Sequence, residues 1–286
     1  MLTENEEALC ASRPNQIEYQ RIDDLHFLGN YLRTLPISMA RMMENAHDWE
    51  HLPFVHASSF TSIDLIEKGA WGWRAKIGLP GGEDYQLLDL IVDEARNYWV
   101  STVYSGFGTG TEIHTQATEL GANEVEVDVR FYLPEAPASD AIANTVLRYL
   151  ADQYRLLYDE DTSLMIGRQT ALDDWAKRVE KSLDPAAVLV GRLSELDRKM
   201  VYSVDTAKGR FCVRWWQEGW IAHSAVCPHM LGPLIEAVPD QRGAIVCPWH
   251  GYRFDIVSGA SLDGKCRDLP QAPQLRFQEG NLYIVT

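Results

Sequence analysis

The sequence predicts an α+β fold in two domains: an antiparallel sheet with a long helix, followed by a small all-β domain. Between residues 70 and 133, apolar and polar residues alternate in a series of short segments, as they do in antiparallel strands. Residues 141–183 follow without alternation and predict one long helix or two. The helical pattern breaks around SLDPAAV, and short strand-like segments then continue to the C-terminus. We therefore expect domains at residues 1–183 and 188–286.

The length and charge of the chain limit the classes of protein to which it can belong. A chain of 286 residues can bury two ordinary cores. Its 41 acidic and 26 basic residues give a formal charge of −15, which argues against binding nucleic acid or anionic membranes. The acidic N-terminus MLTENEEALC lacks the apolar core of a secretion signal, and no apolar run approaches the roughly 18 residues that span a bilayer. We expect a cytoplasmic protein in which three cysteines are free thiols: Cys10, Cys212 and Cys266.

A helix is predicted over PISMARMMENAHDW, residues 36–49, and we expect it to continue to His51. The segment contains good helix formers and an apolar stripe. Pro53 disfavours helical geometry at the residue before it and should end or kink the helix there. Asn45 and Asp48 should therefore lie in successive turns before the break.

Two histidines, His51 and His56, stand on either side of this break. Five residues at 100° each would leave them about 140° apart on a straight helix, so a break lets both imidazoles turn toward one point. Two histidines and one carboxylate make the facial triad that binds non-haem Fe(II) and leaves positions open for O₂. The alternative is an ordinary cluster of hydrogen-bonded histidines at a helix end.

Five segments predict the strands of an antiparallel meander with turns at LPGGED and LGAN: AWGWRAKIGL, YQLLDLIVDE, YWVSTVYSG, TEIHTQATEL and NEVEVDVRFYL. The glycine-rich residues 106–110 precede a strand-like segment rather than a helix, so they predict a turn and not a nucleotide-binding loop. We expect no flavin or nicotinamide domain. Candidates to line a cavity beside the sheet are Trp71, Trp73, Trp99, Phe107 and His114.

Two short boxes near the C-terminus, Cys227-Pro-His229 and Cys247-Pro-Trp-His250, contain the ligands of a metal centre. Two thiolates and two imidazoles suit tetrahedral zinc, and they also suit an iron–sulfur cluster with thiolates on one iron and imidazoles on the other. A proline follows each cysteine, and Gly251 follows the second histidine. This context favours the cluster.

The segments HSAVCPHMLGPL and CPWHGYRFDIVSG together resemble the Rieske [2Fe–2S] family. The resemblance implies that four residues hold a [2Fe–2S] cluster: Cys227, His229, Cys247 and His250. In Rieske proteins of respiratory complexes each box carries a further cysteine, and the pair forms a disulfide. Gly232 and Trp249 occupy these positions here. The resemblance is therefore to the low-potential centres of oxygenases and their ferredoxins, toward the lower end of a range of about −150 to +300 mV.

The upstream pattern N-x-x-D-x-x-H-x-x-x-x-H resembles the mononuclear-iron motif of Rieske non-haem iron oxygenases. This resemblance implies that His51 and His56 are iron ligands. It also implies that Asp48 bridges the electron path from the cluster to the iron and that Asn45 lies near the iron.

The last iron ligand of the family is an aspartate far downstream, often in a Glu-Asp pair on a long helix. Glu160-Asp161 matches that pair, so we assign Asp161, with Asp159 as the alternative. A curved antiparallel sheet around a long C-terminal helix is the helix-grip architecture of START-like proteins, which the catalytic domains of these oxygenases share. Such a domain encloses an apolar cavity suited to a small organic molecule. The family places its Rieske domain first, whereas here the START-like domain comes first.

The resemblance implies an oxidoreductase with two metal centres. An external reductase or ferredoxin would reduce the [2Fe–2S] cluster, an electron would pass to a mononuclear Fe(II), and O₂ would hydroxylate or oxidatively demethylate a small, aromatic substrate. We expect a homotrimer, because the family passes electrons between neighbouring subunits. The alternative is a START-like ligand-binding protein fused to a Rieske ferredoxin domain, acting in electron transfer without oxygenase chemistry.

Overall fold

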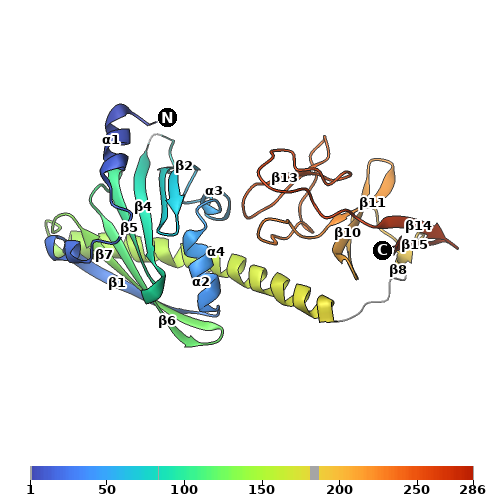
Figure 1. Ribbon diagram of the computed structural model, residues 1–286, viewed down its shortest axis with the longest axis horizontal. Helices are drawn as coiled ribbons and strands as arrows, with labels where there is room; N and C mark the ends of the chain where they lie inside the picture. The colour runs from blue at the N-terminus through green and yellow to red at the C-terminus, as the bar shows by residue number, and fades with distance from the viewer. Residues whose placement is uncertain (1, 83, 181–186, 286) are drawn as a thin grey trace. The chain divides into compact units, whose positions relative to one another are not determined.

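The computed structural model describes residues 2–82, 84–180 and 187–285. They form two compact units, Met1–Ile166 and Gly167–Thr286 (Figure 1). The boundary between the two residue ranges falls inside a long helix, α4 (Asp140–Glu180). The predicted linker around residues 183–188 lies mostly outside the described residues, and the domain limits remain a prediction.

The first unit contains one seven-stranded antiparallel sheet in the order β1-β7-β6-β5-β4-β3-β2. Its strands are β1 (His26–Leu35), β2 (Ser62–Gly69), β3 (Gly72–Gly78), β4 (Tyr85–Asp93), β5 (Tyr98–Gly106), β6 (Glu112–Gly121) and β7 (Glu124–Leu133). The five predicted segments correspond to β3 through β7, which confirms the meander. The two edge strands, β1 and β2, were not predicted. Each pairs with one neighbour and leaves most of its side chains partly exposed, so the apolar alternation of a buried strand is weak there.

Helix α4 packs against one face of this sheet (Figure 1). The rings of Phe131 on β7 and Tyr154 on α4 lie 5.5 Å apart between centroids. At the bulge in β1, a side chain on Gly29 would come within 2.7 Å of Leu147 on the helix. A long helix held against an antiparallel sheet is the helix-grip architecture, so the predicted START-like fold is confirmed.

Besides α4, the described residues of the first unit form five short helical elements. They are α1 (Glu4–Ser12), the 3₁₀ turn η1 (Tyr19–Asp24), α2 (Met39–His47), α3 (Leu52–Val55) and the 3₁₀ turn η2 (Glu94–Arg96). The predicted helix over residues 36–49 exists as α2 but ends at His47, with Asp48 as its C-cap. The expected continuation to His51 is therefore wrong. Pro53 lies in the first turn of α3, a position that proline favours, so it starts a second helix instead of ending the first.

The glycine-rich residues 106–110 form the predicted turn between β5 and β6. Gly106, Gly108 and Gly110 all have positive φ, between 77° and 89°. Because side chains other than hydrogen are disfavoured in this conformation, the three glycines serve the turn geometry.

The second unit is built from short antiparallel strands in three small sheets, ordered β11-β10-β9, β12-β13 and β14-β15-β8. The strands are β8 (Val188–Arg192), β9 (Val201–Thr206), β10 (Gly209–Trp216), β11 (Gly219–Ser224), β12 (Ala244–Val246), β13 (Arg253–Asp255), β14 (Gln274–Gln278) and β15 (Asn281–Val285). Its core includes Phe211, Val213, Leu282 and Ile284, all nearly inaccessible to solvent. The predicted small all-β domain is confirmed.

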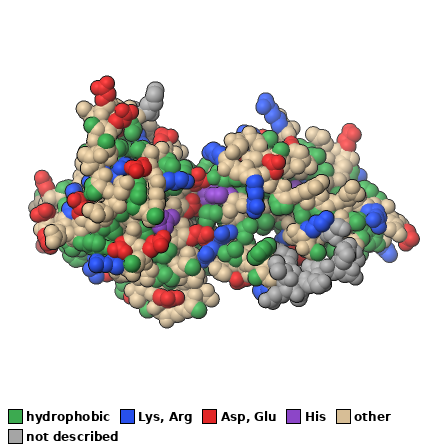
Figure 2. All heavy atoms as spheres, viewed as in Figure 1, with side chains coloured by type: hydrophobic (Ala, Val, Ile, Leu, Met, Phe, Trp, Pro, Cys, Tyr) green, Lys and Arg blue, Asp and Glu red, His purple; other side chains and the backbone are tan. Residues whose placement is uncertain are grey.

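Charged groups are spread over the surface. On the face shown in Figure 2, Asp and Glu side chains are scattered over both units and interleaved with Lys and Arg. Within the described ranges, none of the helices combines the length and apolar character needed to cross a membrane.

Candidate functional site

Three buried side chains of the first unit converge on one point: His51, His56 and Asp161. Nε2 of His51 lies 3.2 Å from Nε2 of His56. Oδ1 of Asp161 lies 3.3 Å and 3.0 Å from these two nitrogens, respectively. Helix α3 explains how the histidines meet, because they are its N-cap and C-cap and its single turn brings both rings toward α4.

The three ligand atoms are arranged as donors to one metal ion. Three atoms on one face of an octahedron lie about 3.0 Å apart for metal bonds of about 2.1 Å, and tetrahedral ligands lie about 3.4 Å apart. The observed separations of 3.0, 3.2 and 3.3 Å fall between these values. Oδ1 of Asp161 is buried and has no aligned hydrogen-bond partner among the described residues, despite both short contacts. The donor set of two imidazoles and one carboxylate suits non-haem Fe(II).

A carboxylate stands behind each imidazole. Oε2 of Glu160 lies 2.7 Å from Nδ1 of His56, and Oδ2 of Asp48 lies 3.4 Å from Nδ1 of His51. A carboxylate at Nδ1 favours the tautomer with its proton there, which leaves the Nε2 lone pair for a metal. From the sequence, Glu160 was predicted only as the neighbour of Asp161, with no role of its own. The signal was its place one residue before the ligand, because adjacent helical residues, 100° apart, can reach two sides of one histidine.

The carboxylates control the charge of the cluster. Burial acts to lower the pKa of His51, but Asp161 and Asp48 outweigh it and raise that pKa to about 10. Burial likewise acts to raise the pKa of Asp161, but contacts with His51 and His56 hold it well below its usual value. The contacts therefore favour the charged forms of His51 and Asp161 in this buried site.

Of the two aspartates considered for the third ligand, Asp161 faces the histidines and Asp159 faces away. Asp159 forms an ion pair with Arg33 at 2.5 Å, and its side chain is 48% exposed. The two residues lie about 200° apart around the helix, so one of them must point away. The role of Asp161 as a ligand stays a prediction that this geometry supports.

A cavity of about 130 Å³ opens beside the cluster, and Asn45 and Asp48 are among its lining residues. Oδ1 of Asn45 is buried and has no hydrogen-bond partner within the described ranges. Of the five candidates proposed to line a cavity, Trp73 and Trp99 line this one. The other three, Trp71, Phe107 and His114, do not.

His114 instead belongs to a buried polar group under the N-terminal segment. Its Nδ1 lies 2.7 Å from the hydroxyl of Tyr98, and its Nε2 lies 3.0 Å from Oε2 of Glu112. Arg21 pairs with the same carboxylate. His114 does not line the cavity because successive residues of a strand face opposite sides of the sheet. The next residue of β6, Thr115, faces Tyr158 on α4, so His114 faces away from this helix.

The two cysteine–histidine boxes of the second unit form two loops with the same hydrogen bonds. In the first, the amide of Cys227 donates to the carbonyl of Gly232, and the amide of Leu231 donates back to Cys227. In the second loop, the amide of Cys247 likewise donates to the carbonyl of Tyr252, and the amide of Gly251 donates to the carbonyl of Cys247. Leu231 and Gly251, at matching positions, both have positive φ, 62° and 66°.

These loops bring the four predicted cluster ligands together. The rings of His229 and His250 lie 4.5 Å apart between centroids, and both cysteines are buried. Contact with Cys227, aided by His250 and by backbone amides of the loop, lowers the pKa of the Cys247 thiol below its ordinary value. Amides directed at sulfur stabilise a thiolate, the form that binds iron. The residues present therefore fit the cluster.

Gly232 and Trp249 have no thiol, so no disulfide can join the two loops at these positions, and Gly232 is also closely packed. A Cβ atom at this position would lie 2.8 Å from Sγ of Cys247 and 3.1 Å from the ring of Trp249. All five cysteines of the chain are free, including the three predicted free thiols.

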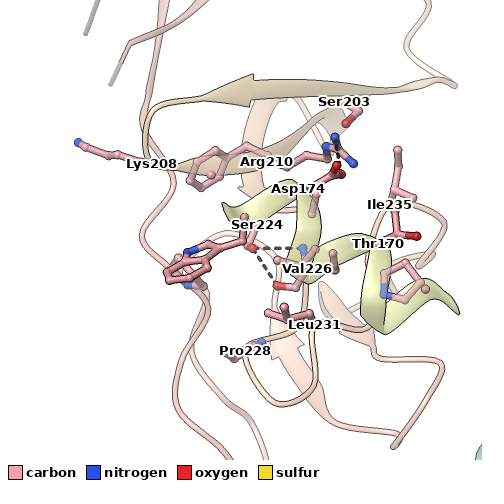
Figure 3. A pocket seen from close by; sticks show the side chains of 18 of the residues that line it. Thr170, Asp174, Ser203, Lys208, Arg210, Ser224, Val226, Pro228, Leu231 and Ile235 are labelled. Carbon is pink, nitrogen blue, oxygen red and sulfur yellow. Dashed lines mark hydrogen bonds and ion pairs between the residues drawn. The ribbon is translucent and has the colours of Figure 1, made fainter. Parts of the chain in front are cut away.

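A second cavity, of about 420 Å³, lies within the second unit. Ser224, Val226, Pro228 and Leu231 are among its lining residues, and the Ser224 hydroxyl bonds the backbone of Val226 (Figure 3). None of the predicted metal ligands lines this cavity.

Comparison with known proteins identifies the second unit. Residues 186–279 match the family model of the Rieske [2Fe–2S] domain. Flavonoid 8-hydroxylase 2 of Ocimum basilicum is 42% identical over 64 residues, which are 21% of this chain and 11% of that protein. Pheophorbide a oxygenase of Oryza sativa subsp. japonica is 34% identical over 92 residues, 32% of this chain and 14% of that protein. The chain thus spans a small part of these relatives, both of which are named as chloroplastic.

Two solved structures each resemble part of this chain. The Zhui aromatase/cyclase from Streptomyces sp. R1128 is 10% identical, with a TM-score of 0.42, over 50% of this chain and 95% of its own. The ferredoxin of carbazole 1,9a-dioxygenase from Nocardioides aromaticivorans IC177 is 23% identical, with a TM-score of 0.32, over 35% of this chain and 97% of its own. Together, the family match, the paired loops and the sheet with its long helix show that this chain carries a Rieske [2Fe–2S] domain, which follows a START-like helix-grip domain.

Proposed function

We propose that the chain is a Rieske non-haem iron oxygenase that acts on a small organic substrate. The observation that carries the proposal is the convergence of His51, His56 and Asp161 on one point beside an apolar cavity. The Rieske domain supplies the redox partner that such a site needs. A ferrous ion held by these three side chains would supply the activation of O₂ for hydroxylation or oxidative demethylation.

Each residue around the site has a part in this function. His51 and His56 present their Nε2 atoms. Glu160 holds the ring of His56 from behind through Nδ1, whereas the carboxylate of Asp48 lies 3.4 Å from Nδ1 of His51 without an aligned hydrogen bond. By resemblance, Asp48 also lies on the electron path from a cluster held by Cys227, His229, Cys247 and His250. The apolar walls of the cavity exclude water and hold the substrate beside the ligands.

The electron donor in this proposal is a separate reductase or ferredoxin. Rieske oxygenases pass electrons between subunits of a ring, so the proposal includes a homotrimer. A cytoplasmic location, with neither nucleic acid nor membrane as a partner, likewise remains a prediction.

Metal analysis tests the proposal directly. We expect about three irons and two acid-labile sulfides per chain, since a Rieske centre contributes two of each. His51→Ala and Asp161→Ala should each remove one iron and leave the visible spectrum of the cluster unchanged. Asp159→Ala is the matched control, because this neighbouring carboxylate points away from His51 and His56. The variant should keep all three irons.

Two outcomes would contradict the oxygenase. Two irons per chain, with no O₂ uptake by the reduced protein, would favour the alternative of a START-like ligand carrier fused to a ferredoxin. Zinc without sulfide would contradict the cluster itself.

A further inference from the structure

We propose that the substrate is a neutral, single-ring aromatic molecule. The proposal rests on the proposed function, because it concerns the cavity beside the His51, His56 and Asp161 cluster. It follows from the volume of that cavity, the charges around it and the shape of its walls.

The volume limits the substrate to about one ring. The cavity measures about 130 Å³. An apolar cavity of about 150 Å³ accommodates one benzene molecule, whereas sites for drug-sized ligands measure about 300–1,000 Å³. A single ring with a small substituent therefore fills the space, and a fused two-ring system exceeds it.

The lining residues exclude a charged substrate. No Lys or Arg is among the described side chains that line the cavity, and the only carboxylates there are Asp48 and Asp161. A substrate carboxylate would lose its hydration and find no Lys or Arg side chain to pair with. A substrate cation would also lose its hydration, because Asp48 lies against His51 and Asp161 would already be engaged by a divalent metal ion held with His51 and His56.

The walls suit an aromatic ring. Trp73, Trp99 and Phe60 line the cavity together with aliphatic residues. Aromatic side chains interact with a ring by edge-to-face or offset contacts, worth about 0.5–1.5 kcal/mol per pair beyond the area that they bury. Trp73 is held in place, because its indole Nε1 donates to the carbonyl of Ala46 at 3.1 Å. This fixed indole is the wall that limits the size of the substrate.

Binding to the iron-loaded, full-length protein under anaerobic conditions tests the proposal. Calorimetry would compare anisole with 4-methoxybenzoate, which adds a carboxylate, and with 2-methoxynaphthalene, which adds a ring. We expect anisole to bind at least tenfold more tightly than either. Binding of 4-methoxybenzoate or 2-methoxynaphthalene as tight as that of anisole, or no binding of anisole, would overturn the proposal.

Two matched pairs of variants assign the selection to the cavity. Trp73→Ala should raise the affinity for 2-methoxynaphthalene at least tenfold, whereas Trp71→Ala, outside the cavity, should not change it. Ser101→Arg, inside the cavity, should raise the affinity for 4-methoxybenzoate at least tenfold, whereas Ser105→Arg, on the same strand but outside the cavity, should not. Leu88→Ala replaces Trp73→Ala if the latter does not fold. Equal effects within either pair would contradict the assignment.

This experiment separates the substrate class from the reaction. The binding order requires no turnover, so it can hold even where reduced protein and O₂ give no product. That result would contradict the proposed oxygenase function but would still support the proposed class of ligand. Turnover of 4-methoxybenzoate but not of anisole would support the oxygenase function and contradict the proposed class of substrate.

Discussion

Replacing Glu160 should weaken metal binding at the His51, His56 and Asp161 cluster, although Glu160 itself is no ligand. Its Oε2 lies 2.7 Å from Nδ1 of His56, an imidazole that is almost fully buried. A hydrogen bond to a charged group contributes about 1.5–3 kcal/mol, and loss of such a supporting partner lowers metal affinity about 10–100-fold. Glu160→Ala removes both charge and acceptor, so we expect a loss near 100-fold. Glu160→Gln keeps an acceptor, so we expect about tenfold.

The measurement is a competition between the protein and a chelator for Fe(II), with Mn(II) as an air-stable substitute. The visible spectrum of the cluster reports in the same sample that the Rieske domain is intact. Asp159→Asn is the control, because it changes the neighbouring carboxylate of the same helix that pairs with Arg33 instead. An affinity of Glu160→Ala within twofold of the wild type would refute the reasoning.

Three further predictions concern stability and cluster assembly. Burial is the main cause that lowers the pKa of His223 to about 4 from 6.5, so the unfolded chain binds the extra proton first and stability falls as pH drops from 6.5 to 4. The free energy of unfolding should fall by about 3 kcal/mol over this range, which urea unfolding at pH 7 and pH 4.5 would measure. His223→Leu should abolish this fall, and an unchanged pH dependence in the variant would contradict the prediction. Gly232→Ala places a Cβ 2.8 Å from Sγ of Cys247 and should reduce cluster content, measured as acid-labile sulfide, with wild-type content as the contrary result. Asp89→Asn, which breaks a buried pair with Arg74 at 2.6 Å, should destabilise the first unit by about 3–5 kcal/mol in urea unfolding, and a change below about 1 kcal/mol would contradict it.

Local patterns predicted most of the fold. Strands β3 to β7 are buried on at least one face, so their sequences alternate clearly. The edge strands β1 and β2 were missed because partial exposure weakens the same pattern. The helix over residues 36–49 was extended too far, because proline at position 53 can end one helix or begin another, and the sequence alone does not distinguish the two.

The Rieske boxes can be recognised without a structure, since each places its cysteine and histidine within one short loop whose hydrogen bonds are local. The identity of the acidic residue of α4 that meets His51 and His56 instead depends on the packing of the whole unit. Asp159, Glu160 and Asp161 are consecutive, and each successive residue turns by 100° around the helix. Which of them faces the histidines depends on how α4 is rotated against the sheet. That rotation is set by packing between residues far apart in the chain, such as Phe131 with Tyr154, and no local pattern encodes it.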